Sequence, residues 1–343
     1  MKQQEGQELA PQGNVEASLV SVIVPVYNSA EELALCLAAI MRSDLPAFEC
    51  IVIDDASTDP GIAEVAERFG VRYDRMPQRS GPALARNAGV GMAEGQIVFF
   101  CDADMLLHPG ALSQAMQLLE SEPGVAAVIG SYDDKPADPS LLSQYRNLYH
   151  HWNHQMASEE ASTFWTGCGA IRKSVFLQVG GFSSEYAEPC IEDIELGYRL
   201  REAGHRIRLL KSMVGTHLKR WRFWDMVRTD IFRRGVPWMA LLLQHRNVPW
   251  DLNLNKRARL ATAAAALLPF SLLSALVLDP LITLFSALTL VVLIVLAQMP
   301  FYRLLLQRKG IAFTCAAVPL QLVFFMGCGL ALPLGYLRYL RPR

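Results

Sequence analysis

The C-terminal third of this chain is so poor in charge that it limits where the chain can fold. Between Leu260 and Gln298 the only charged side chain in 39 residues is Asp279, and Ile311 to Leu337 contains none. A helix needs about 20 apolar residues to cross a bilayer. A buried helical core domain is the alternative interpretation. The favoured prediction for residues 259–343 is a membrane region with segments at about 260–278, 281–299 and 312–334.

Basic residues flank these segments and predict their orientation. They are Lys256, Arg257 and Arg259 before the first segment, Arg303, Arg308 and Lys309 after the second, and Arg338, Arg341 and Arg343 after the third. By the positive-inside rule, the first two groups place the preceding soluble domain on the cytoplasmic side, at a cell (inner) membrane. The last group also favours the inside. Whether the third segment crosses or is re-entrant therefore stays open.

The remainder of the chain divides into three parts. Residues 1–18 are polar without an apolar signal and are expected to form a disordered tail. Residues 19–218 alternate short apolar strands with amphipathic helices, which predicts an α/β fold with a doubly wound, mostly parallel sheet. Residues 219–258 mix Trp, Phe and Arg at helical spacing and are expected to form amphipathic interfacial helices. Seven irregularly spaced cysteines fit a reducing compartment.

Polar side chains gather where the predicted strands end. Asn28 follows the first strand, Asp54 and Asp55 end the second, and Asp102 and Asp104 follow the buried strand that begins at Gln96. Ligands of open α/β sheets bind beyond the carboxyl ends of the strands. Two carboxylates this close raise one another's pKa unless a cation lies between them, and Mg²⁺ or Mn²⁺ shared with a phosphate meets that need. The sequence therefore predicts a metal–diphosphate site.

Several motifs in order resemble those of family 2 glycosyltransferases, over roughly residues 19–240. The motifs are Ser21-Val22-Ile23-Val24-Pro25-Val26-Tyr27-Asn28, Ile51-Val52-Ile53-Asp54-Asp55-Ala56-Ser57-Thr58-Asp59, Asp102-Ala103-Asp104, Gly180-Gly181-Phe182 and Glu192-Asp193. A haloacid-dehalogenase-like phosphatase also has Asp-x-Asp after a strand, but after its first strand rather than its fourth. The resemblance implies a GT-A type doubly wound mixed sheet with Rossmann-like nucleotide binding, a nucleotide-sugar donor and inversion at the anomeric carbon.

The resemblance also implies roles for residues at the donor side of the site. Pro25, Tyr27, Asn28, Asp54 and Asp55 would hold the base and ribose, and Arg86 and Asn87 would face the nucleotide. Asp104 would bind the divalent metal directly, while Asp102 would contact ribose or metal-bound water. His217 matches a position near the metal or diphosphate in some relatives.

At the acceptor side, Asp193 matches the position of the family's catalytic base, with Glu192 as its orienting neighbour. Relatives line the acceptor pocket with a segment like the one that contains Trp165 and Cys168. Lipid-using and processive relatives carry Gln-x-x-Arg-Trp on an interfacial helix, whereas this chain has Arg233-Arg234-Gly235-Val236-Pro237-Trp238. The departure weakens a polymer-synthase interpretation, although Arg233, Arg234 or Trp238 could still contact diphosphate or acceptor. His150, His151 and His154 are expected on an interfacial or acceptor-lining helix rather than at a metal.

The leading hypothesis is a metal-dependent, membrane-anchored glycosyltransferase that uses Mg²⁺ or Mn²⁺. It would move a sugar from a nucleotide-diphosphate sugar to a lipid or lipid-linked acceptor, and no nucleic-acid partner is expected. Two alternatives are a processive polysaccharide synthase and a non-catalytic nucleotide-sugar-binding membrane protein. The sugar, the base and the acceptor are not readable from the sequence.

Overall fold

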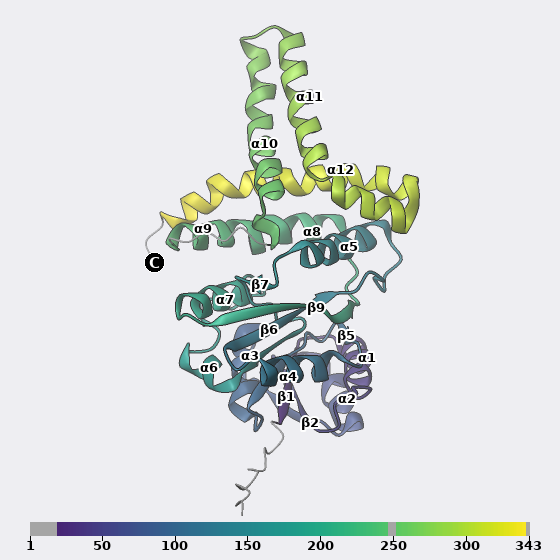
Figure 1. The fold of residues 1–343 in the computed structure, drawn as a ribbon, viewed down its shortest axis with the longest axis vertical. Coiled ribbons are helices and arrows are strands. Elements are labelled where there is room, and N and C mark those ends of the chain that lie inside the picture. Colours follow the sequence, from purple (N-terminus) through teal and green to yellow (C-terminus); the bar gives the residue numbers. More distant parts are fainter. Residues whose placement is uncertain (1–18, 246–251, 341–343) are drawn as a thin grey trace, which may run out of the picture.

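The computed structural model describes residues 19–245 and 252–340, and it stacks three layers (Figure 1). An α/β domain lies at one end, a layer of helices crosses it, and a helical hairpin projects from that layer. The predicted tail at 1–18 lies outside the described residues, as do Arg341 and Arg343.

The α/β domain is built on one mixed sheet, with strands in the order β3-β2-β1-β4-β8-β6-β9-β5 and with β7 paired to β9. The first four strands along the chain run parallel, while β8 pairs antiparallel with β4 and β6. The strands are β1 Val20–Val26, β2 Phe48–Asp54, β3 Arg72–Arg75, β4 Ile97–Phe100, β5 Met105–Leu107, β6 Val125–Tyr132, β7 Glu160–Ala161, β8 Gly169–Arg172 and β9 Arg206–His217. The expected α/β class with a mixed sheet is confirmed.

Helices cover both faces of this sheet, because its central strands are apolar on both sides. β1 and β4 are buried along their whole length and separate two clusters of apolar side chains. The helices of this domain are α1 Ala30–Ile40, α2 Gly61–Phe69, α3 Pro82–Met92, α4 Ala111–Ser121, α5 Leu141–Met156, α6 Lys173–Gln178 and α7 Glu192–Glu202. Parallel pairing of Val26 with Asp54 brings the carboxyl ends of β1 and β2 to one edge, where β4 also ends. That edge faces the helical layer.

The helical layer contains the segment predicted to be interfacial. It is formed by α8 Phe223–Arg228, the π-helical turn η1 Thr229–Gly235 and α9 Val236–Gln244. Trp224 and Phe232 are exposed on it, as expected for side chains that meet a membrane surface. Two short 3₁₀ turns, η2 Leu252–Leu254 and η3 Ser274–Leu276, flank the next helix.

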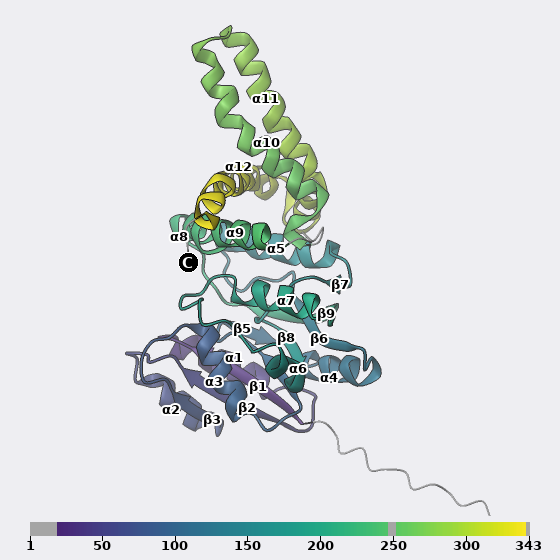
Figure 2. The ribbon, with the colours of Figure 1, turned by 90° about the vertical axis from the view of Figure 1, so that its left-hand side faces the viewer.

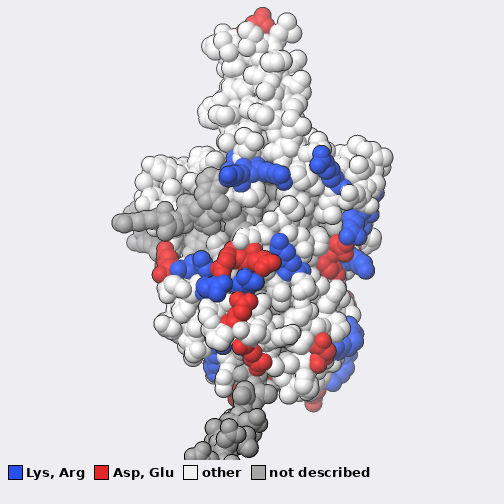
Figure 3. Space-filling view, viewed as in Figure 1, with Lys and Arg blue, Asp and Glu red and all other residues white. Residues whose placement is uncertain are grey.

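Three C-terminal helices are long and apolar enough to cross a membrane: α10 Lys256–Leu273, α11 Pro280–Ala297 and α12 Met299–Tyr339. The third of these helices is oriented differently from the first two. α10 and α11 form an antiparallel hairpin that stands upright, whereas α12 lies across its base (Figures 1 and 2). Each helix of the hairpin has 18 residues, a length of about 27 Å. Side chains on the hairpin are uncharged except at its tip, and basic groups gather at its base (Figure 3).

Both ends of α12 lie against the α/β domain. Near its start, Arg308 pairs with Asp134 at 2.8 Å, and near its end Arg338 lines a small cavity with Glu185. Gly310, with φ +80°, breaks the helix between these ends and lets it turn back across the domain. The third apolar segment therefore lies across the base of the first two rather than beside them.

Candidate active site

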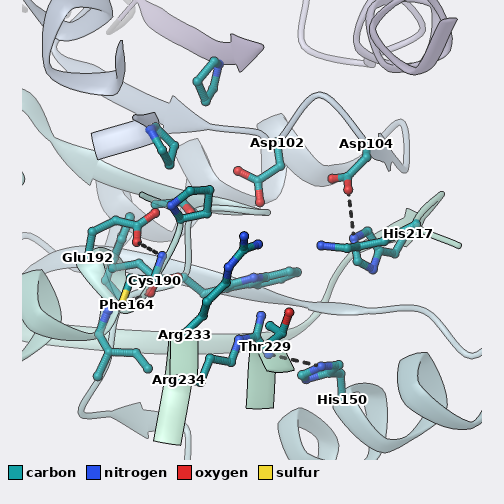
Figure 4. A pocket seen from close by; sticks show the side chains of 18 of the residues that line it. Asp102, Asp104, His150, Phe164, Cys190, Glu192, His217, Thr229, Arg233 and Arg234 are labelled. Carbon is teal, nitrogen blue, oxygen red and sulfur yellow. Dashed lines mark hydrogen bonds and ion pairs between the residues drawn. The ribbon is translucent and has the colours of Figure 1, made fainter. Parts of the chain in front are cut away.

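The carboxyl ends of β1 and β4 open into a cavity of about 350 Å³. One wall comes from the sheet edge and α3, and the opposite wall comes from α5 and η1 (Figure 4). Of the predicted residues, the following line it: Pro25, Tyr27, Arg86, Asp102, Asp104, Trp165, Glu192, Asp193, His217, Arg233, Arg234 and Trp238.

Asp104 and His217 face one another at one end of the cavity. His217 Nδ1 is 2.9 Å from the amide oxygen of Asn147, which can only accept, so this nitrogen donates. His217 Nε2 then faces Asp104 Oδ2 at 3.3 Å. Burial raises the pKa of Asp104, but His217 and Lys219 outweigh burial and bring that pKa to about 2. A carboxylate oxygen and an imidazole nitrogen at this separation suit a shared cation.

These two groups fit a divalent metal that takes its other ligands from substrate. Among the described residues, no three His, Cys, Asp or Glu side chains converge as a complete protein cage. Mg²⁺ and Mn²⁺ sites that serve phosphates commonly use few protein ligands, with phosphate and water oxygens completing the octahedron. Asp104 and His217 would therefore supply two protein ligands to the metal, and its remaining ligands would come from the cavity side.

Asp102 lies one residue from Asp104 but belongs to a different network. Arg86 donates from Nη2 to Asp102 Oδ1 at 2.7 Å and from Nη1 to Glu192 Oε1 at 3.0 Å. Burial alone would lower the pKa of Arg86, yet the two carboxylates outweigh it and raise that pKa. The buried guanidinium thus joins the end of β4 to the start of α7, and Arg86 and Glu192 are 106 residues apart in the sequence.

Asp193 differs sharply from its neighbour Glu192. Glu192 is buried, and its second oxygen accepts from the backbone N–H of Cys190 at 2.9 Å, so both oxygens have partners. Asp193 accepts only from the backbone of Ile194 among the described residues. Burial and the charge of Glu192 raise the pKa of Asp193 to about 7, against the opposing effect of Arg86 and Arg234. A carboxylate poised near neutral pH suits general-base chemistry.

Two residues expected at the nucleotide hold the strand ends in place. Asp54 is completely buried and accepts from Ser57 N, Tyr73 Oη and Arg75 Nη1 at 2.8, 3.1 and 2.9 Å. Asn28, at φ +52°, accepts from the backbones of Thr58 and Asp59. Neither Asp54 nor Asn28 lines the cavity. The direct contact with the nucleotide that was expected of them stays a prediction, beside the positioning role that these hydrogen bonds give them.

Asp55 stays at the edge of the site. Its oxygens accept from the backbone N–H groups of Ser80 and Gly81 at 2.7 and 2.8 Å. It also lines a side cavity of about 110 Å³ that adjoins the main one and contains Tyr27, whose ring lies 4.5 Å from the guanidinium of Arg79.

Asn87 and Cys168 are not among the residues that line the cavity. Asn87 exchanges two hydrogen bonds with the backbone of Phe182, which fixes α3 to the Gly180-Gly181-Phe182 turn instead of facing the cavity. Cys168 is fully buried in the apolar core beside the sheet. Its neighbour Trp165, in contrast, lines the cavity and packs 4.5 Å from the ring of Tyr132.

Arg233 and Arg234 reach the cavity from η1 (Figure 4). Arg234 Nη1 lies 3.4 Å from His150 Nε2. Arg233 is exposed and has no hydrogen-bond or ion-pair partner within the described part of the chain. Trp238, one turn further along, lines the same cavity and donates to Tyr198 Oη at 2.9 Å.

Lys219 and Tyr132 also line the cavity, although neither was predicted as a site residue. Burial lowers the pKa of Lys219, while Asp104 opposes that shift. Tyr132 is buried among the rings of His150, His154, Trp165 and His217. Burial lowers the pKa of His154 to about 4 and that of His150 well below its usual value, so both rings are neutral. The position of Lys219 two residues beyond His217, at the end of a strand, is the signal that could have revealed it.

Comparison with known proteins agrees with this geometry. The family model for glycosyl transferase family 2 matches residues 21–180, and that for the N-terminal domain of galactosyltransferase matches residues 146–220. Glycosyltransferase AglE of Haloferax volcanii is 26% identical over 205 residues, 58% of this chain and 66% of its own length. Validoxylamine A glucosyltransferase of Streptomyces hygroscopicus subsp. jinggangensis is 27% identical over 229 residues, 57% and 54% of the two chains.

A mannosyltransferase from Pyrobaculum calidifontis, solved with GDP-Man and Mn²⁺, shares the fold with a TM-score of 0.60 at 20% identity, over 98% of this chain and 91% of its own. This chain spans less than two thirds of the length of the two curated relatives. The sheet order and its strand-end cavity are those of a GT-A fold. Over residues 21–180, this chain therefore matches the model of glycosyl transferase family 2.

Proposed function

We propose that this chain is a metal-dependent, inverting glycosyltransferase that moves a sugar from a nucleotide-diphosphate sugar to a lipid or lipid-linked acceptor at a membrane. The observation that carries the proposal is the placement of the Asp104–His217 pair and Asp193 in one cavity. The Asp104–His217 pair suits a metal–diphosphate group, and Asp193 suits the removal of a proton from an acceptor hydroxyl. Inversion in one step needs only one such base.

On the donor side, Asp104 and His217 would hold the metal, which would neutralise charge that develops on the departing diphosphate. The mixed oxygen and nitrogen ligands favour Mn²⁺ over Mg²⁺, since Mg²⁺ prefers oxygen alone. The base would occupy the side cavity, against Tyr27 and Asp55. Lys219 and Arg233 add positive charge to the wall that the diphosphate would face.

On the acceptor side, Asp193 would accept the hydroxyl proton at one of its carboxylate oxygens. The Arg86–Glu192 ion pair holds the start of α7 and therefore the position of Asp193. Trp165 lines the same cavity as Asp193 and offers a flat apolar surface to the acceptor. The helical layer above the cavity leads to the apolar hairpin, and this proximity supports an acceptor that lies in a membrane. The basic residues at the base of the hairpin favour the cytoplasmic side for the α/β domain.

The experiment is a thermal-shift panel with UDP-, GDP- and dTDP-sugars, each with Mn²⁺ and with Mg²⁺. Wild type is compared with Asp104→Ala and with a control, Glu64→Ala, which removes an exposed acid on α2. One donor class should raise the melting temperature of wild type and control in the presence of metal, and not that of Asp104→Ala. The proposal fails when no donor stabilises wild type, or when Asp104→Ala responds like wild type.

A further inference from the structure

A second cavity lies beside the active site, within the helical layers. It has a volume of about 120 Å³ and is walled by α5, η1, α9, α10 and α12. It shares His150, Arg234 and Trp238 with the active-site cavity, so the two spaces meet at these side chains. Its remaining walls belong to no part of the site described above.

The walls of the second cavity are mostly apolar. Phe324, Phe325 and Leu332 come from α12, and Met239 and Leu242 come from α9. These are helices of the layer that lies under the apolar hairpin (Figure 2). A polypeptide or a polysaccharide would leave polar groups unpaired against such walls, whereas a hydrocarbon chain would not.

Of the described residues, three charged side chains interrupt these walls: Arg146, Asp230 and Arg234. Arg146 is only 2% exposed, lines the cavity and pairs with buried Asp230. Its Nε and Nη1 groups have no hydrogen-bond partner within the described residues. Buried N–H groups without acceptors cost free energy, and more when the group is charged. An anionic oxygen at this end of the cavity would supply the missing acceptor.

A second cation lies at the junction between the two cavities. Arg234 lines both spaces and is only half-buried. Asp193 lines the same active-site cavity as Arg234. A ligand with its anionic group near Arg146 and Arg234 would therefore direct whatever lies beyond that group toward the candidate base. From the second cavity to the active site, the lining therefore changes from apolar side chains to the two arginines and then to Asp193.

We propose that the second cavity binds an anionic lipid, with the first part of its apolar chain among α9, α10 and α12 and its phosphate against Arg146 and Arg234. The head group beyond the phosphate extends into the active-site cavity, where its hydroxyl is the acceptor; this last step rests on the proposed function. The acceptor class is thereby narrowed to a lipid-linked group with a phosphate linker. The small volume admits one narrow chain, and the remainder of that chain continues along the apolar helices.

The test uses the purified full chain in a neutral maltoside detergent and three probes in isothermal titration: dodecyl phosphate, dodecanol and inorganic phosphate. Two variants on α12 form a matched pair. Cys328→Phe fills the cavity, because Cys328 lines it, while Leu330→Phe adds the same ring at an exposed position outside it. Arg234→Gln removes the cation at the junction. Correct folding of each variant is checked by its melting temperature.

Wild type and Leu330→Phe should bind dodecyl phosphate at least about tenfold more tightly than dodecanol or inorganic phosphate. Cys328→Phe and Arg234→Gln should each weaken that binding by about tenfold or more. Equal binding of dodecanol and dodecyl phosphate overturns the anionic site, and unchanged binding in Cys328→Phe overturns its location. Should a variant misfold, the comparison of the three probes on wild type still decides.

The donor panel, run on the same preparations, separates this inference from the proposed function. Donor binding without dodecyl phosphate binding refutes the lipid site alone. Dodecyl phosphate binding that depends on the cavity, without any donor binding, refutes the proposed function and leaves the lipid site standing.

Discussion

Asp193 and Glu192 are adjacent in the chain, yet their surroundings give them different chemistry. Glu192 is held by Arg86 and a backbone N–H, while Asp193 faces the cavity with a raised pKa. Two acids at the start of a helix also complement the helix dipole, which would be a purely structural role. The structure separates the two roles, since only Asp193 keeps acceptor capacity free for a substrate proton.

Replacing Asp193 with Asn should lower kcat by about 100- to 10,000-fold, because general-base catalysis contributes that much. The KM for the donor should change little, since the proposed role of Asp193 is to take a proton from the acceptor. Initial rates with the donor identified in the panel give both constants. Glu195→Gln on the same helix, whose carboxylate pairs with Arg199, serves as the control. Wild-type kcat in Asp193→Asn would remove this residue from the reaction.

The pH dependence should reveal the same carboxylate. Because the pKa of Asp193 is raised to about 7 and only the deprotonated form is a base, kcat/KM should fall about tenfold per pH unit below about pH 7 and level off above it. His150 and His154 do not account for that limb, because burial lowers their pKa values. The residual activity of Asp193→Asn should not show this fall in kcat/KM below about pH 7. A wild-type profile that is flat from about pH 6 to pH 8 would contradict the assignment.

Asp54 should matter to stability rather than to donor binding. Replacing Asp54 with Asn weakens its bonds to Tyr73 and Arg75 inside the sheet edge, which should cost about 1–3 kcal/mol and lower the melting temperature by several degrees. Asp74→Asn, which removes an exposed acid on the neighbouring strand β3, should leave the melting temperature unchanged. A donor KM raised tenfold in Asp54→Asn, without loss of stability, would restore this residue to the nucleotide site.

At the scale of elements, the start of α3 depends on the loop before α7. Gly81 has φ +85°, and a Cβ there would overlap the carbonyl oxygen of Ala187. Gly81→Ala should therefore displace that loop, lower kcat/KM for the donor and lower the melting temperature. Gly70→Ala is the matched control, because Gly70 has φ +63° but open space around it, so only backbone strain of about 1 kcal/mol is added. Equal effects of the two variants would show that the contact with Ala187 is unimportant.

The strands and their polar ends could be predicted from the sequence, because apolar runs and motifs are local signals. The partners of those polar groups could not. Arg86 meets Asp102 and Glu192 only because the sheet brings β4 and α7 together, and no local pattern encodes that pairing. The burial of Asp54 and Cys168 likewise depends on side chains distant in sequence. For α12, hydropathy is the same whether a helix crosses a membrane or lies along it, so only its packing distinguishes the two.

For the whole molecule, the stacking of layers implies a membrane topology. The apolar hairpin α10–α11 is about as long as a bilayer core is thick, and Asp279 sits at its turn. Both ends of α12 contact the α/β domain. The hairpin alone would therefore enter the bilayer, while α12 would lie along the surface with its exposed apolar side chains toward lipid. Under this arrangement the active site and the second cavity both lie close to the lipid head groups.

Protease cleavage of epitope tags in sealed membrane vesicles tests this topology. A tag at the N-terminus and a tag after Arg343 should be accessible from the same side of sealed membrane vesicles, because α12 begins and ends against the α/β domain. A tag inserted between Leu278 and Asp279 should be accessible only from the opposite side, since the hairpin crosses once in each direction. Solubilising the vesicles with detergent provides the control, as all three tags should then be cleaved. A C-terminal tag on the side opposite to the N-terminal one would mean that α12 crosses the bilayer, and the second cavity would then lie within the bilayer rather than at its surface.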